Sequence, residues 1–178
     1  AAIILLFIYH QKIMEELVDI RKSFWRIVFL SVFGPVLFPT ALYIGLQYTT
    51  ALNAAILLSS SPALVLIINA LVFREKITTR NIAGVLLSSI GVLYLLLKGN
   101  VLDFQSISIG KGGAWAFLSA LSWAIYCSCL RIRDKNVSGS SFVTVTAVLG
   151  AIMLLPYALS EYYGAFKQIQ PVSINMGL

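Results

Sequence analysis

The sequence predicts an all-α protein whose helices form a polytopic transmembrane bundle. Hydrophobic residues make up 59% of the 178 residues and charged residues 11%, with a mean hydropathy of +0.90; soluble domains average about 25% charged residues. The 47 residues between Arg26 and Arg74 contain no Asp, Glu, Lys, Arg or His. One helix of that length would measure about 70 Å, whereas a bilayer's hydrocarbon core is about 30 Å thick. This run is therefore expected to cross the membrane twice. Recurring charge-free segments disfavour the alternative, a soluble protein with unusually long buried helices.

The N-terminal part is predicted to contain half a span and a polar helix. Residues 1–9 are apolar but too few to cross a bilayer, and no basic region marks them as a signal peptide. Because the chain also starts without Met, we interpret it as a fragment of a longer protein and this run as the tail of a truncated helix. Residues 10–26 mix acids and bases and are expected to form an amphipathic loop helix.

The charge-free run is predicted to be a transmembrane hairpin. Its two spans are Ile27–Leu46 and Asn53–Phe73, and the polar residues Gln47–Thr50 form the turn, with Asn53 as a helix-start signal. Prolines interrupt both spans, since proline removes a backbone donor and clashes with the preceding turn. Neighbouring helices or water must then satisfy the freed carbonyls. The prolines expected to bend these helices are Pro35, Pro39 and Pro62.

Three further spans are expected, Ile77–Leu97, Gly112–Leu130 and Phe142–Leu159, followed by a polar, aromatic tail. Basic residues retained on the cytoplasmic side set the orientation of such a protein. Alternate loops hold ten of the 13 basic residues and the other loops hold three. The loops 10–26, 74–80 and 131–140 are therefore predicted to be cytoplasmic. We expect an integral membrane protein, with the plasma membrane as its location.

The fourth span has two distinct faces. Trp115, Ser119, Ser122 and Tyr126 recur at spacings of four, three and four, which keeps them within roughly 40° of one another on a helix. This stripe could line a substrate cavity, or its hydroxyls could bond their own backbone with Trp at the interface. The opposite face is a ladder of small residues suited to close helix packing, namely Gly112, Ala116, Ala120, Ala124 and Ser128.

The hairpin offers a second set of candidate substrate-pathway residues: Tyr43, Gln47, Asn53 and Ser60. Tyr43 shares one face of its helix with Thr40 and Gln47. Gln47 and Asn53 flank the hairpin tip, where turn formation and capping are the favoured alternative to a role in the substrate pathway. On the second span, Ala51, Ala55, Ser59 and Ala63 form a small-residue ladder expected to pack against a neighbour.

The ionisable residues disfavour catalysis. All seven acids fall in loops or at helix ends, and the single His, His10, lies outside the spans. An intramembrane hydrolase needs a Ser with a His partner, or clustered carboxylates with a metal. Cys127 and Cys129 point to different sides of one predicted helix, so they are interpreted as packing residues rather than a metal site. No catalytic residue, metal or cofactor is predicted.

The run between Tyr48 and Leu96, YTTALNAAILLSSSPALVLIINALVFREKITTRNIAGVLLSSIGVLYLL, resembles the EamA repeat of the drug/metabolite transporter superfamily. The features that carry the resemblance are a small-polar helix start, a mid-helix Pro62, the turn Arg74-Glu75-Lys76-Ile77, and the following Gly84 and Gly91. Residues 112–131, with Trp115, Trp123 and Tyr126, look like the opening helix of a second such repeat.

The resemblance implies a ten-helix carrier made of two inverted five-helix repeats, with a central substrate cavity and alternating access. On that template, residues 1–98 form most of the first repeat, 99–111 an extracytoplasmic linker, and 112–178 the start of the second. The predicted function is secondary transport of small polar metabolites or drugs. A non-transporting membrane scaffold and an intramembrane enzyme are the alternatives. Expected partners are a small-molecule substrate and the lipid bilayer, with no nucleic acid; a homodimer is left open.

Overall fold

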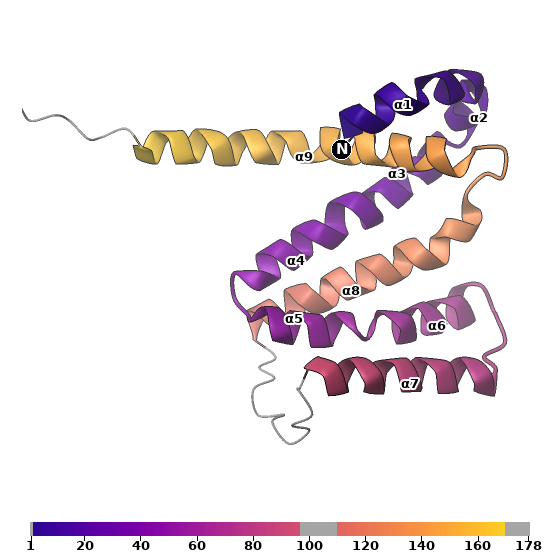
Figure 1. The fold of residues 1–178 in the computed structure, drawn as a ribbon, viewed down its shortest axis with the longest axis vertical. Coiled ribbons are helices and arrows are strands. Elements are labelled where there is room, and N and C mark those ends of the chain that lie inside the picture. Colours follow the sequence, from indigo (N-terminus) through magenta and orange to yellow (C-terminus); the bar gives the residue numbers. More distant parts are fainter. Residues whose placement is uncertain (1, 97–109, 170–178) are drawn as a thin grey trace, which may run out of the picture.

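The computed structural model describes residues 2–96 and 110–169, and this part of the chain is helical with no strand (Figure 1). The elements are α1 (Ala2–Glu15), α2 (Leu17–Lys22), α3 (Phe24–Ser31), the π-helix η1 (Val32–Leu37), α4 (Phe38–Leu46), α5 (Ala51–Leu58), α6 (Ser61–Val72), α7 (Thr79–Leu96), α8 (Lys111–Cys129), the short 3₁₀ turn η3 (Leu130–Ile132) and α9 (Gly139–Ile169). The all-α prediction is confirmed.

Four helical stretches of the described chain are long and apolar enough to cross a membrane: Phe24–Leu46, Ala51–Val72, Lys111–Ile132 and Gly139–Ser160. They coincide with the first, second, fourth and fifth predicted spans. The third predicted span is the helix α7, with 18 residues, or about 27 Å at the usual rise. The last residue of that prediction and most of the predicted linker lie outside the described residues. The chain is thus an integral membrane protein of several helices.

The hairpin tip lies where the sequence predicts it. The first span ends at Leu46 and α5 begins at Ala51, so the turn is residues 47–50. Thr50 caps α5, since its hydroxyl accepts a hydrogen bond from the Asn53 amide at 3.3 Å. Asn53 is therefore in the first turn and does not start the helix; its side-chain amide donates to the Thr49 hydroxyl, also at 3.3 Å. The start signal was correct in type and misplaced by three residues.

Helix α8 is the central element of the bundle. It packs against α4 on one side and against α5 and α6 on the other, while α7 lies outside α5 and α6 (Figure 1). The predicted small-residue ladder of α8 makes this possible, because all five of its members are buried. Gly45 and Gly112 mark the closest approach: a Cβ on Gly45 would lie 3.1 Å from the Gly112 carbonyl oxygen.

Helix α9 forms a separate edge of the bundle with α1 and α3. These three helices and η1 pack together, and their apolar cluster contains Ile20, Ile27, Leu30, Val137 and Phe142. Helix α4 then diverges from α9 along its length (Figure 1). The distance between these two helices therefore increases away from α3.

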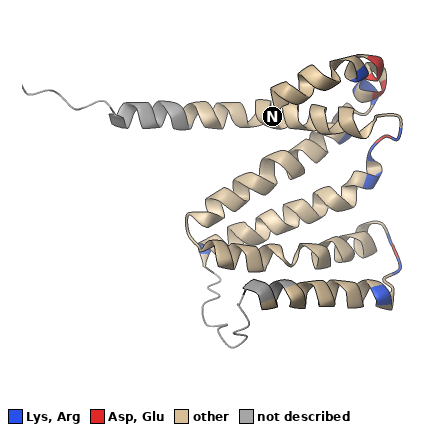
Figure 2. Ribbon diagram, in the orientation of Figure 1, with Lys and Arg blue, Asp and Glu red and all other residues tan. Residues whose placement is uncertain are grey.

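The basic residues gather at one end of the helices. Figure 2 shows the α1–α2 region, the α6–α7 loop and the α8–α9 loop at the same end. The start of α8, whose first residue is Lys111, lies at the other end. The first of these ends is called the basic end below. Its three segments correspond to the loops 10–26, 74–80 and 131–140, which the count of basic residues assigns to one side of the membrane. Their common position at one end of the helices agrees with that assignment.

Three expectations about individual helices were wrong. The apolar and polar N-terminal segments do not divide at residue 9, because α1 continues to Glu15. Helix α9 does not end at Leu159; it continues into the predicted tail as far as Ile169, and the rest of that tail lies outside the described residues. On α5 the buried residues are Asn53, Ala54 and Ile56, not the ladder that begins at Ala51. A spacing of four stays on one face only in a continuous α-helix, and this span breaks at residues 59–60.

Candidate functional site: three uncharged hollows at broken helices

A hollow of about 410 Å³ lies between α4 and α9; it is here called the α4–α9 hollow. Its polar groups are the side chains of Thr40 and Tyr43 on α4, of Gln47 directly after α4, and of Tyr157 on α9. The remaining lining is apolar: Pro39, Ile44, Leu154 and Ala158. Thr40, Tyr43 and Gln47 are therefore together on the face that their spacing predicts, and this face borders an open space.

A second hollow of about 380 Å³, the proline hollow, lies deeper along the same helix and shares Pro39 with the first. Gly34, Pro35 and Phe38 line one wall, and Val143, Thr146 and Ala147 of α9 line the other. Trp123 and Tyr126 of α8 complete it. The ring centroids of Phe38 and Trp123 are 4.8 Å apart, and those of Trp123 and Tyr126 are 5.4 Å apart. The result is a row of three aromatic rings beside a break in the helix.

A third hollow of about 380 Å³ lies on the other side of those rings, between the broken α5–α6 span and α7. Phe38 and Trp123 line it as well, so these two rings separate the second and third hollows. Its other lining residues are Ala55, Leu58, Ser59, Ser61, Pro62 and Ser88. Among the described residues, no Asp, Glu, Lys, Arg or His lines any of the three hollows.

The first break is the π-helix η1, which contains Pro35 and replaces α-helix over Val32–Leu37. Proline cannot donate to the carbonyl four residues earlier, and π-type turns are frequent at functional sites. Two hydroxyls of α8 bond to backbone carbonyls of this region: Ser122 donates to Phe33 and Ser119 donates to Phe38, each at 2.7 Å. These two hydrogen bonds join α8 to the broken region of the first span.

The second break separates α5 from α6, just before Pro62. Ser59, Ser60 and Ser61 each donate a hydroxyl hydrogen bond to the carbonyl three residues earlier, at 2.6, 2.6 and 2.7 Å. The last of these acceptors is Leu58, the carbonyl that the missing amide of Pro62 would otherwise have bonded. The three serines therefore satisfy the break within the span itself.

The structure distributes the predicted pathway residues among different environments. Tyr43 and Gln47 line the α4–α9 hollow, and Tyr126 lines the proline hollow. Ser119 and Ser122 are buried between α8 and the first span, and their hydroxyls bond to that span rather than to their own helix. Asn53 and Ser60 make local backbone or turn hydrogen bonds, and Trp115 is partly exposed beside the hairpin tip.

Some lining residues were not predicted. Thr146 and Tyr157 of α9 border the proline hollow and the α4–α9 hollow. They are 11 residues apart, close to three helical turns, so they share one face of α9 and a periodicity search of that helix would have found them. Phe38 and Trp123 gave no such signal, because aromatic residues in a span fit lipid, packing and a cavity equally well.

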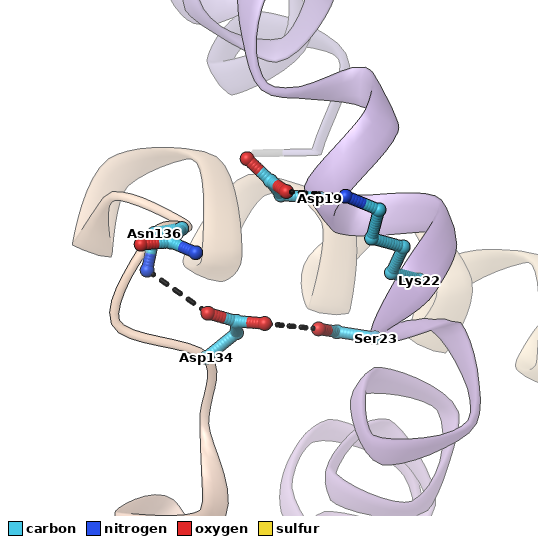
Figure 3. Close-up of polar contacts among 5 residues, drawn as sticks. All are labelled: Asp19, Lys22, Ser23, Asp134 and Asn136. Atoms are coloured by element: carbon cyan, nitrogen blue, oxygen red, sulfur yellow. Dashed lines mark hydrogen bonds and ion pairs between the residues drawn. The ribbon is translucent and has the colours of Figure 1, made fainter.

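Polar contacts close the basic end; we call this set the basic-end latch. The Ser23 hydroxyl donates to Asp134 Oδ2 at 2.9 Å, and the Asn136 amide donates to Asp134 Oδ1 at 3.0 Å (Figure 3). The Ser138 amide, just before α9, donates to Glu16 Oε2 at 2.9 Å. Arg131 Nη1 lies 2.8 Å from Glu75 Oε1. These contacts join the α8–α9 loop to α1–α2 and to the α6–α7 loop.

Hydrogen bonding stabilises the charged forms of two latch carboxylates. The Asn136 amide and then the Ser23 hydroxyl lower the pKa of Asp134 below its usual value. Burial acts to raise the pKa of Glu16, but hydrogen bonds from Ser138 and Ser141 outweigh it, and that pKa is also lowered. Both latch carboxylates are therefore ionised at neutral pH.

Comparison with known proteins gives the family. Residues 1–97 match the EamA-like transporter family. The chain is 26% identical over 159 residues to the uncharacterized transporter YyaM of Bacillus subtilis (strain 168), covering 89% of this chain and 52% of that protein. It is 30% identical over 149 residues to an uncharacterized transporter of Archaeoglobus fulgidus, covering 82% of this chain and 48% of that protein. A WAT1-related protein of Arabidopsis thaliana, At2g40900, is 24% identical over 173 residues, covering 86% of this chain and 42% of that protein.

The chain spans about half the length of these curated relatives. No solved structure matches it. The Bacillus and Archaeoglobus relatives are named as transporters, in keeping with the apolar helices of this chain. The family match covers more than half of the chain, and the chain therefore belongs to the EamA-like transporter family.

Proposed function

We propose that this protein is a secondary transporter that moves small polar metabolites or drugs by alternating access, along the groove between α4–η1 and α9. The observation that carries the proposal is the continuity of the groove: the α4–α9 hollow and the proline hollow share Pro39 and together follow the helix from Gln47 to Gly34. A transporter needs such a route through the apolar layer, whereas a scaffold does not.

The lining supports an uncharged substrate with a flat, apolar part. The described groove offers hydroxyl and amide groups at one end and three aromatic rings at the other. Small-molecule sites usually combine apolar walls with a few polar groups that fix orientation, and aromatic rings stack on flat ligands. A charged substrate would need a counter-charge that these walls do not contain.

The proposed conformational state is closed at the basic end and open at the other. Helices α3 and η1 pack against α9, while α4 diverges from it. The basic-end latch crosses the closed side. With the basic end in the cytoplasm of a plasma-membrane protein, as the charge distribution favours, the groove opens away from the cytoplasm. Residues 1–98 and 112–178 would belong to two inverted repeats, and the exchange between states would bend the chain at Pro35, Pro39 and Pro62.

Transport in reconstituted vesicles tests the proposal. The intact protein in proteoliposomes should take up or release radiolabelled neutral metabolites from a broad panel faster than empty vesicles. The informative variant is Tyr43→Phe, which removes only the hydroxyl from the α4–α9 hollow. Its control is Tyr94→Phe, because Tyr94 is exposed on α7 and lines none of the three hollows.

We expect Tyr43→Phe to raise the KM for a transported substrate about five- to tenfold, the value of about one hydrogen bond, with Tyr94→Phe unchanged. Substrate-dependent flux that is equal in both variants would contradict the assignment of the groove. The absence of flux for every compound, with the protein folded and correctly inserted, would favour a scaffold. Retention of flux in His10→Ala would separate transport from a histidine-dependent enzyme.

A further inference from the structure

A fourth hollow, of about 660 Å³, lies at the basic end and plays no part in the proposed transport route. Its lining is Arg26 from α3 together with residues 131–136 of the α8–α9 loop. Four of these residues carry a positive charge, Arg26, Arg131, Arg133 and Lys135, and one, Asp134, carries a negative charge. We refer to it as the basic hollow.

The contacts of the basic hollow leave an excess of positive charge. Arg131 is paired with Glu75 and its guanidinium lies 4.6 Å from the centre of the Phe73 ring. Asp134 uses both carboxylate oxygens in the basic-end latch. The Arg133 guanidinium lies 5.6 Å from the centre of the Phe142 ring. Among the described residues, Arg26, Arg133 and Lys135 form no ion pair, and the one carboxylate of the hollow is already hydrogen-bonded.

Topology alone does not explain this arrangement. Retaining a loop in the cytoplasm requires basic residues in it, but it does not require residues from distant segments to line the same hollow. Arg26 is brought to the α8–α9 loop by the hydrogen bond between Ser23, one helical turn earlier, and Asp134 (Figure 3). The other basic residues of this end, such as Arg21 and Arg80, do not line the hollow.

The basic hollow lies at the end of the first membrane-spanning stretch, at the level expected for lipid head groups. Arg26 follows directly on Phe24 and Trp25, which begin the first membrane-spanning stretch and are both exposed. Aromatic residues at the ends of spans mark the membrane–water interface. The guanidinium of Arg26 is therefore placed where the phosphates of the adjacent leaflet lie, and basic pockets on this side of membrane proteins suit anionic head groups.

We propose that the basic hollow binds a phosphate group, with Arg26, Arg133 and Lys135 as its cationic partners. Guanidinium groups bind phosphate oxygens in pairs, and a lysine adds a mobile point charge. The chemistry is the same for an anionic phospholipid and for a soluble phosphate compound. Because the hollow opens at the interface, both sources can reach it, and the experiment distinguishes them.

The test uses the intact protein purified in a neutral detergent. Binding is measured by native mass spectrometry and by the shift in thermal unfolding, with phosphatidylglycerol, phosphatidylcholine and inorganic phosphate as separate probes. The variant is Arg26→Gln with Lys135→Gln. The matched control is Lys111→Gln, which removes a basic residue from the opposite end.

We expect saturable binding of phosphatidylglycerol, weakened about 25-fold in the double variant, because each basic residue near an anionic lipid contributes about fivefold. Phosphatidylcholine should not compete, and Lys111→Gln should bind like the wild type. Saturable binding of inorganic phosphate with no preference for phosphatidylglycerol would support the same site with a soluble ligand. Lys135→Gln alone, at an exposed turn position, should lose about fivefold and serves if the double variant does not fold.

Two results would overturn the proposal. One is equal affinity of the wild type and both variants for every phosphate-bearing probe. The other is an equal loss of affinity in Lys111→Gln, since that would reflect net charge rather than a site. Neither result depends on transport activity, so the proposal stands or falls separately from the proposed function.

Discussion

The packing of α8 against the hairpin tip can be tested with one methyl group. Gly112, in the first turn of α8, lies so close to the tip that a Cβ there would be 2.7 Å from Thr49 Cβ, 2.7 Å from the Tyr48 carbonyl carbon and 2.8 Å from the Thr49 amide nitrogen. Carbon atoms in ordinary contact are about 3.5–4.0 Å apart. Gly112→Ala therefore has to separate α8 from the tip by about 1 Å, and two of the three obstructing atoms are backbone that cannot rotate away.

The size of the effect follows from two opposing terms. Overpacking a well-packed position costs about 1–3 kcal/mol. Replacing glycine by alanine in a helix stabilises it by about 0.5–1 kcal/mol. Gly84 on α7 isolates the second term, because a Cβ there would meet no atom within 4 Å. We expect Gly84→Ala to raise the free energy of unfolding slightly and Gly112→Ala to lower it, with a difference of about 1–3 kcal/mol that is the overpacking cost alone.

The measurement is reversible unfolding of both variants in mixed micelles, titrated with a denaturing detergent and followed by circular dichroism. The wild type and the two variants should insert and elute identically before titration. Equal unfolding free energies for Gly112→Ala and Gly84→Ala, to within about 0.5 kcal/mol, would refute the close approach of α8 to the tip.

Three further predictions concern the site, the latch and one loop. In Gly34→Ala the new Cβ would lie 2.8 Å from the Tyr126 ring, so the ring must shift into the proline hollow. Transport into vesicles should then fall while thermal stability changes little. Unchanged transport would argue against a substrate route through the proline hollow. Folding lowers the pKa values of Glu16 and Asp134, so the stability that these carboxylates contribute is complete above their unfolded pKa values near 4 and is lost as the pH falls through their folded pKa values. The free energy of unfolding, followed from pH 8 to pH 3, should therefore fall only at the acid end. A fall in that free energy between pH 6 and 7 would contradict the prediction. Arg74 has a φ of 52°, a left-handed conformation that costs a non-glycine residue about 1–2 kcal/mol. Arg74→Gly should therefore match or exceed the wild type in thermal stability. A marked loss of thermal stability would show that the side chain of Arg74 contributes more than its backbone strain costs.

The sequence predicted best what hydrophobicity and local chemistry decide. The charge-free run had to form two helices, and the polar residues Gln47–Thr50 were its natural turn; the structure turns there because Thr50 caps α5. The small-residue face of α8 was predicted for the same kind of reason, since only Gly, Ala and Ser allow the close approach seen at Gly112.

Contacts between helices were much harder to predict. Ser119 and Ser122 could have bonded their own backbone, lined a cavity or reached another helix. The choice depends on how α8 packs against the first span, where their hydroxyls bond the carbonyls of Phe38 and Phe33. The hollows could not be derived either. Periodicity places Tyr43 and Gln47 on one face, but it does not say that α4 diverges from α9 and leaves that face open.

The three serines before Pro62 have a consequence for the speed of any bending at that point. Their hydroxyls already bond the carbonyls of the last turn of α5, so a change in the angle between α5 and α6 need not leave those carbonyls without a partner in hydrocarbon. The barrier then comes from displacing packed side chains and lipid chains. Bending at this break should accordingly respond to membrane fluidity and lateral pressure more strongly than to agents that compete for hydrogen bonds.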